Sequence, residues 1–265
     1  MFKKISLICI SVGAFVFFQL LSLYPAYFLN IHAEEFTDSK NNYRIDYLNI
    51  NSKKVKFVFF DNQKECPIII YYHGNNELVD HHVEYFSEFV KENCVRALLV
   101  EYNGYGSSDG FPSLKETTEN TMYWLKLNKL NNERLNVWGR SIGSAHAYNF
   151  LSKYPDKIDN IIIHAGFLTP LNFFTDNKNI INILENFMVV NYNVEDKISE
   201  LTKNKNINLI IFHGTKDHMF SEQVPKHIAT LFETHQIKSK VYLYEGGHNI
   251  IPSNMYDIVG KLVNE

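Results

Sequence analysis

The segment LNVWGRSIG, residues 135–143, decides how the rest of the sequence is interpreted. Residues 135–138 have the composition of a short buried strand, and the pattern G-x-S-x-G follows at once and leads into a helical stretch. A strand, a tight turn and a helix in this order place a serine above the carboxyl edge of a sheet, where the N-terminus of the helix favours an anion. The segment therefore predicts that Ser141 is a nucleophile. The alternative is that Ser141 only caps the helix.

Two turns that follow the serine in the sequence offer the partners that such a nucleophile needs. A serine hydroxyl reacts well only when a base takes its proton and a carboxylate orients that base. Asp217 ends the turn after the apolar run 207–212, and His248 lies in the glycine-rich loop after the next run. The order serine, acid, histidine predicts Ser141, Asp217 and His248 as the catalytic residues. Other histidines, such as His164 and His213, are expected in loops or on helix faces.

The same chemistry requires hydrogen-bond donors for the oxyanion that develops on the substrate. One predicted donor is the backbone N–H of Ile142, the residue after the serine, and the second is expected in the loop after the third strand. That loop follows the apolar run 68–72 and reads HGNN at 73–76. We predict that the N–H of Asn75 is the second donor, with Asn76 as the alternative. An ordinary turn rich in asparagine would have the same composition.

Short apolar runs alternate with longer amphipathic stretches from residue 43 onward. Most of these runs are continuous in Ile, Val and Leu, which is typical of parallel strands buried on both faces. The alternation predicts an α/β fold with a doubly wound, mostly parallel sheet. The expected strands are 44–50, 55–60, 68–72, 95–101, 135–138, 158–164, 207–212 and 240–244, the first two forming a hairpin. The expected helices lie near 79–92, 114–129, 142–153, 221–235 and 253–263.

One long interruption, residues 167–206, separates two of the expected strands and contains its own apolar stretch. Loops of this length usually have a function, often as a lid over a site. We therefore predict a short cap at about 167–200.

The composition of the 265 residues restricts the class of protein. A hydrophobic content of 45% is sufficient for one large core. The net charge of −3 argues against nucleic-acid binding, which requires a basic face. The three cysteines have no C-x-x-C spacing, so structural zinc is not expected, and no metal or cofactor is predicted.

The N-terminal 33 residues are predicted to anchor the protein in a membrane, with residues 34–265 as one globular domain. Lys3 and Lys4 precede an uncharged run, residues 5–23, which as a helix would span about 28 Å, close to the thickness of a bilayer core. A cleaved signal peptide and a buried core helix are the alternatives. The position of the two lysines predicts a single-pass protein whose larger domain faces away from the cytoplasm.

Together, these motifs resemble those of the α/β-hydrolase superfamily, and more narrowly its small membrane-anchored serine hydrolases, which include protein depalmitoylases and related acyl hydrolases. The resemblance covers about residues 43–265 and rests on HGN at 73–75, YNGYGSS at 102–108 with Gly110 and Pro112-Ser113, GRSIG at 139–143, HGTKD at 213–217 and GGHN at 246–249. It implies the α/β-hydrolase fold with Ser141, Asp217 and His248 as the triad. The sequence departs from the family at Asn103, where the family often has an arginine that could form an ion pair.

The same resemblance bears on the cysteines. In the fold that it implies, the third and fourth strands are parallel neighbours. Cys66 immediately precedes the third strand and Cys94 the fourth, so both should lie at one edge of the sheet. In an extracytoplasmic domain they could form a disulfide, and two buried thiols are the alternative.

The predicted activity is that of a serine hydrolase that cleaves carboxylic esters or thioesters, on lipids or acylated proteins, through an acyl-enzyme. The short cap predicts an open pocket, which suits acyl chains better than small peptides. An aspartate nucleophile, which epoxide hydrolases and dehalogenases of this fold use, is absent at position 141. A peptidase, an acyltransferase and a catalytically silent binding protein of the same fold are the alternatives.

Overall fold

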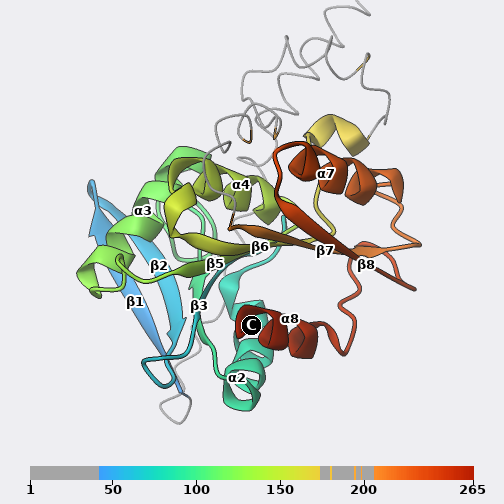
Figure 1. Cartoon of the computed structure of the whole chain (residues 1–265). Helices are drawn as coiled ribbons and strands as arrows, with labels where there is room; N and C mark the ends of the chain where they lie inside the picture. Colours follow the sequence, from blue (N-terminus) through green and yellow to red (C-terminus); the bar gives the residue numbers. More distant parts are fainter. Residues whose placement is uncertain (1–41, 174–179, 181–193, 195–197, 199–205) are drawn as a thin grey trace, which may run out of the picture.

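The computed structural model describes residues 42–173, 180, 194, 198 and 206–265 (Figure 1). The predicted membrane anchor at 1–33 and most of the predicted cap at 167–200 lie outside these residues. Among the described helices, none combines the length and the apolar character needed to cross a bilayer. The described part contains every strand and helix predicted between residues 44 and 263 other than the cap.

Eight strands form one sheet at the centre of the described part. They are Tyr43–Ile50 (β1), Lys53–Phe60 (β2), Ile68–Tyr72 (β3), Arg96–Val100 (β4), Leu135–Arg140 (β5), Ile158–His164 (β6), Asn208–Gly214 (β7) and Lys238–Tyr244 (β8). Their order in the sheet is β1-β2-β4-β3-β5-β6-β7-β8. The first two strands form the predicted hairpin, β2 runs antiparallel to β4, and all later neighbours are parallel. The prediction of a mostly parallel α/β sheet is confirmed.

Helices cover both faces of the sheet (Figure 1). The α-helices are Val83–Glu92 (α2), Leu114–Leu127 (α3), Gly143–Lys153 (α4), Gln223–Thr234 (α7) and Met255–Val263 (α8), and the short 3-10 helices are Val79–His82 (η1), Pro155–Lys157 (η2) and Pro170–Phe173 (η3). Phe86 of α2 and Val259 of α8 belong to the core on one face. Trp124 of α3, Tyr148 of α4 and Phe232 of α7 belong to the core on the other face.

The internal strands are continuous apolar runs because helices cover both faces of the sheet. Successive side chains of a strand point to opposite faces. In β3, Ile68, Ile70 and Tyr72 enter one core, and Ile69 and Tyr71 enter the other. Full burial of each such isoleucine contributes roughly 2 kcal/mol to folding, so a polar residue in the strand would weaken one of the two cores.

Several predicted strand ends differ from the structure by one or two residues, and two differences bear on the site. The helix expected near 79–92 is divided into η1 and α2 at His82. Within η1, the side chain of Asp80 forms an ion pair with Lys56 of β2, and His82 contacts Glu77, so both ends of this segment are tied to other parts of the chain. Strand β5 continues to Arg140, because Gly139 and Arg140 still pair with β6. The turn therefore begins at Ser141.

Cys66 and Cys94 form a disulfide, with their Cα atoms 5.0 Å apart. The cysteines precede β3 and β4, whose first residues Ile68 and Arg96 are paired in the parallel register. Of the two alternatives for these cysteines, the disulfide is confirmed.

Candidate active site

Ser141 lies at the sharp turn between β5 and α4. Its φ of +51° is a left-handed conformation, which costs a non-glycine residue about 1–2 kcal/mol. The N–H of Ser141 donates to the carbonyl oxygen of His164 at 2.9 Å and ties the turn to the end of β6. A side chain at position 143 would overlap the carbonyl oxygen of Tyr72, so Gly143 is required where α4 starts against the end of β3.

Three side chains predicted from the sequence come together at this turn. Nε2 of His248 lies 2.9 Å from Oγ of Ser141, and Nδ1 of His248 lies 2.8 Å from Oδ2 of Asp217. Asp217 and His248 belong to the loops after β7 and β8, so the parallel strands carry all three residues to one edge of the sheet. Because an ionised carboxylate can only accept, Nδ1 donates to Asp217, and Nε2 is left to accept the serine proton.

The carboxylate of Asp217 is held by its own loop as well as by His248. Oδ1 accepts the N–H groups of Met219 at 2.8 Å and Phe220 at 3.0 Å. Burial raises the pKa of this carboxyl group, but the hydrogen bonds from His248, Phe220 and Met219 outweigh burial and hold the pKa below its ordinary value. Asp217 is therefore ionised at neutral pH and can stabilise a positive charge on His248.

The loop between β3 and η1 carries Asn75, the second predicted oxyanion donor. Nδ1 of the buried His73 donates to the carbonyl oxygen of Gly74 at 2.8 Å, and the N–H of Gly74 donates to Glu77 at 2.7 Å. A trans peptide unit points its C=O and N–H in opposite directions. The N–H of Asn75 therefore points away from the buried ring. The side chain of Asn75 is held separately, because its Oδ1 accepts the hydroxyl of Tyr105 at 2.8 Å.

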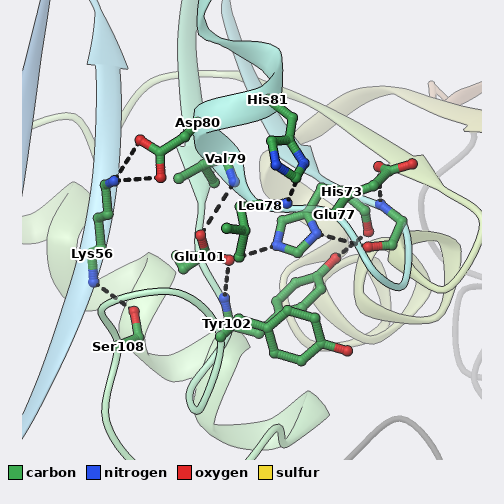
Figure 2. Close-up of polar contacts among 12 residues, drawn as sticks. Lys56, His73, Glu77, Leu78, Val79, Asp80, His81, Glu101, Tyr102 and Ser108 are labelled. Atoms are coloured by element: carbon green, nitrogen blue, oxygen red, sulfur yellow. Dashed lines mark hydrogen bonds and ion pairs between the residues drawn. The ribbon is translucent and has the colours of Figure 1, made fainter. Parts of the chain in front are cut away.

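A buried cluster of charged groups supports this loop (Figure 2). Nε2 of His73 lies 2.8 Å from Oε1 of Glu101, and both side chains are completely buried. The other oxygen of Glu101 accepts the N–H of Val79 at 3.2 Å. Nζ of Lys56 lies 2.6 and 2.7 Å from the two oxygens of Asp80. The loop and η1 are thus anchored to β2 and to the end of β4. No sequence motif indicated the supporting roles of these residues.

His164 and His213 contradict the prediction that they lie in loops or on helix faces. Both are fully buried at the ends of β6 and β7. His164 donates from Nε2 to the hydroxyl of Tyr244 at 2.9 Å, and that hydroxyl donates to the carbonyl oxygen of Ile250 at 2.8 Å. His213 donates from Nε2 to the carbonyl oxygen of Phe220 at 3.0 Å. The two histidines therefore support the loops that carry His248 and Asp217.

Asn103 occupies the position where the resembled family often has an arginine. Its buried side chain donates to the carbonyl oxygen of Asp109 at 3.0 Å and accepts from Nδ2 of Asn120 at 3.0 Å. Neutral hydrogen bonds thus close this loop against α3. Within the described ranges, no group of His, Cys, Asp or Glu side chains is arranged to hold a metal ion.

The mostly parallel sheet, the serine at a strained strand–helix turn and the side chains of Asp217 and His248 at the same edge define the architecture of an α/β hydrolase. Residues 67–203, just over half of the 265 residues, match the family described as alpha/beta hydrolase fold. The chain belongs to this family.

The chain is similar to proteins of several organisms. An uncharacterized membrane protein of Saccharomyces cerevisiae is 23% identical over 275 aligned positions, which cover 98% of this chain and 94% of that protein. A lysophosphatidylserine lipase of Danio rerio is 28% identical over 113 positions, covering 40% of this chain and 29% of the lipase. The solved structure of an esterase from Pyrococcus furiosus has a TM-score of 0.67 at 16% identity and covers 88% of this chain and 97% of the esterase. At this identity the structural likeness shows the fold.

Proposed function

We propose that this protein is a serine hydrolase that cleaves carboxylic esters or thioesters through Ser141, His248 and Asp217. The observation that carries the proposal is the hydrogen-bonded series of side chains, with 2.9 Å between Ser141 and His248 and 2.8 Å between His248 and Asp217. A nucleophile, a base and an orienting carboxylate within hydrogen-bond reach of one another are the groups that acyl transfer requires. Membership of the family supports a hydrolase.

The proposed reaction has two halves. First, Oγ of Ser141 attacks the acyl carbonyl carbon while Nε2 of His248 takes the hydroxyl proton. His248 gives that proton to the leaving alcohol or thiol, and the acyl group remains on Ser141 as an ester. Water then loses a proton to His248 and attacks the acyl-enzyme, which releases the carboxylic acid and returns the proton to Ser141. Asp217 stays ionised throughout and stabilises the imidazolium form of His248.

The backbone N–H groups of Ile142 and Asn75 are the proposed oxyanion donors. Ile142 immediately precedes α4, and the N-terminus of a helix favours negative charge. The hydrogen bond from His73 to Gly74 directs the N–H of Asn75 away from the buried ring. Loss of one such donor typically costs about 3–4 kcal/mol of transition-state stabilisation.

The proposed substrates are esters or thioesters with an apolar acyl group, on lipids or acylated proteins. The ring centroid of Phe220 lies 5.5 Å from that of His248, and Phe220 also packs against Phe167 at 5.3 Å. Apolar rings beside the proposed base favour an acyl chain over a polar peptide. A short cap at about 167–200 would leave the site open, and the similar proteins include a lysophosphatidylserine lipase and an esterase.

A membrane location with the hydrolase domain, residues 34–265, outside the cytoplasm is also proposed. The apolar run at 5–23 within the anchor at 1–33, and the yeast relative described as a membrane protein, support the attachment. The disulfide between Cys66 and Cys94 supports an oxidising compartment. Alkaline carbonate extraction and protease treatment of intact cells test this location. A protein that is extracted by carbonate, or that only lysis exposes to protease, contradicts it.

A fluorophosphonate probe and a series of p-nitrophenyl esters, together with an acyl thioester, test the activity. We expect the probe to label the wild-type protein and the Ser152→Ala variant, at the far end of α4, but not Ser141→Ala, whose turnover falls about a million-fold. Turnover that rises with acyl-chain length supports the lipid or acyl-protein class, and a flat profile contradicts it. Absence of labelling in the folded wild-type protein supports a catalytically silent binding protein instead.

A further inference from the structure

Arg140, the residue before the proposed nucleophile, has a buried guanidinium group that contacts two other loops of the site. Its side chain is 5% exposed, and Nη1 forms an ion pair with Oε1 of Glu77. Nη2 donates to Oδ1 of Asn249 at 3.3 Å. Glu77 lies in the loop that carries Asn75, and Asn249 directly follows His248. One guanidinium group therefore joins the serine turn to the loops of the proposed oxyanion donor and the proposed base.

Glu77 links Arg140 to the backbone of the loop that carries Asn75. Its Oε2 accepts the N–H of Gly74 at 2.7 Å and lies 3.1 Å from Nε2 of His82. Burial lowers the pKa of His82 to about 3, so the ring is neutral and donates a single N–H to Glu77. Both carboxylate oxygens are thus engaged. The carboxylate that Arg140 holds also holds Gly74, the residue before Asn75.

The ion pair lies directly against the loop backbone. A Cβ atom at Gly74 would be 2.7 Å from Nη1 of Arg140 and 2.9 Å from the carboxyl group of Glu77. Arginine suits this place because its planar group donates to two partners in different directions. A lysine would present a single point charge and could not reproduce both contacts.

We propose that Arg140 is a positioning residue that fixes the Asn75 N–H and the His248 ring relative to Ser141, acting through Glu77 and Asn249. The inference rests on the proposed function, because that function assigns the oxyanion and the base to these two loops. A displacement of about 1 Å in such a site can cost on the order of 100-fold in rate.

The test compares Arg140→Gln with Arg96→Gln. The second variant also removes a similarly buried ion pair, but at the end of the sheet where the parallel strands begin, away from Ser141. The side chain of Arg96, at the start of β4, is 4% exposed and its partner Glu133 is 28% exposed, against 5% for Arg140 and 19% for Glu77. Both variants should lose thermal stability. Arg140→Gln is expected to lower kcat for a p-nitrophenyl ester about 100-fold while KM changes less than about threefold.

An alkylboronic acid provides the second readout, because its adduct with serine resembles the tetrahedral intermediate. Arg140→Gln should weaken its inhibition by the same factor as kcat, whereas Arg96→Gln should leave kcat and boronate inhibition unchanged. Glu77→Gln replaces Arg140→Gln in the same comparison if the latter does not fold. If both fold, the double variant should be no worse than the worse single variant, because the two residues act as one unit.

Failure of the positioning role can be distinguished from failure of the proposed function. If Ser141→Ala is inactive but Arg140→Gln and Glu77→Gln keep the kcat of Arg96→Gln, the positioning role is wrong and the proposed function stands. If hydrolysis persists in Ser141→Ala, the proposed function itself is wrong.

Discussion

Nε2 of His73 lies 2.8 Å from Oε1 of Glu101, and neither side chain is exposed. The other ring nitrogen, Nδ1, also lies beside an oxygen atom. The carbonyl oxygen of Gly74, 2.8 Å from Nδ1, can only accept. Nδ1 therefore donates its proton to that oxygen. His73, held on its other side by Glu101, orients the peptide unit that carries the Asn75 N–H.

Two substitutions of His73 each keep one of its two hydrogen-bond contacts and remove the other. The amide nitrogen in His73→Asn can replace Nδ1 as the donor to Gly74, whereas the amide nitrogen in His73→Gln can replace Nε2 and face Glu101. We expect His73→Gln to lose about 100-fold in kcat and His73→Asn to lose less than about tenfold, because only the former releases the Gly74 carbonyl. Ester turnover and thermal melting of both variants provide the measurement. Equal losses of kcat would mean that His73 does not act through Gly74.

Replacement of Asp217 by asparagine should reduce kcat about ten-thousand-fold. The amide can donate to Nδ1 of His248, which then carries its proton on Nε2 and cannot accept the proton of Ser141. Steady-state turnover of a p-nitrophenyl ester measures the loss. Asp159→Asn, at an exposed carboxylate paired with Arg134, is the control and should keep wild-type turnover. Unchanged turnover in Asp217→Asn would assign the orienting role to another carboxylate.

The buried imidazole of His164 should make the protein less stable in acid. Burial and the nearby Arg140 lower the pKa of His164 to about 3, whereas an unfolded chain has a histidine pKa of about 6.5. Between these values the unfolded state binds the extra proton, so the free energy of unfolding falls as the pH falls, by up to about 1.4 kcal/mol per pH unit.

His164→Gln tests this dependence, because glutamine cannot be protonated and can still donate to Tyr244. The free energy of unfolding in urea should depend less on pH in this variant than in the wild type between about pH 4 and 6.5. The difference corresponds to at most one proton fewer taken up on unfolding. His82 has a similarly lowered pKa, so part of the slope should remain. Identical slopes in the two proteins would show that His164 does not contribute.

The disulfide should stabilise the domain without affecting catalysis. Cys66 and Cys94 are 28 residues apart, and closing a loop of this length stabilises the folded state by about 3.5 kcal/mol in the chain-entropy model. The double variant Cys66→Ser/Cys94→Ser, and the wild type in the presence of reductant, should both lose about this free energy of unfolding in urea. Turnover at room temperature should be retained, because the disulfide lies at the edge of the sheet opposite Ser141. A reduced wild type with an unchanged urea midpoint would contradict this account.

Most of the fold could be predicted because the six strands between β1 and β8 in the sheet are buried on both sides. A run such as Ile68–Tyr72 has no polar position, which identifies an internal parallel strand without knowledge of its neighbours. The division of the helix at His82 could not be predicted, because it accompanies contacts with Lys56 and Glu77 that the amphipathic pattern of 79–92 does not express.

The proximity of Ser141, Asp217 and His248 could be predicted because each residue lies in the turn or loop that follows a strand and the chain order is characteristic. The contact of Arg140 with Glu77 depends instead on β3 and β5 lying side by side, which no local pattern near either residue indicates. The burial of His164 and His213 has a similar cause. A histidine at a strand end can face solvent or the interior, and only the neighbouring loops decide which.

Gly143 lies so close to the end of β3 that any side chain there would overlap the carbonyl oxygens of Tyr72 and His73. Backbone meets backbone at this point, so the turn that carries Ile142 and the loop that carries Asn75 cannot move independently. A change of substrate during evolution must therefore come from side chains and from segments beyond this contact. In this protein, the turn and loop proposed to carry the reaction are therefore separate from the segments that could change with the substrate.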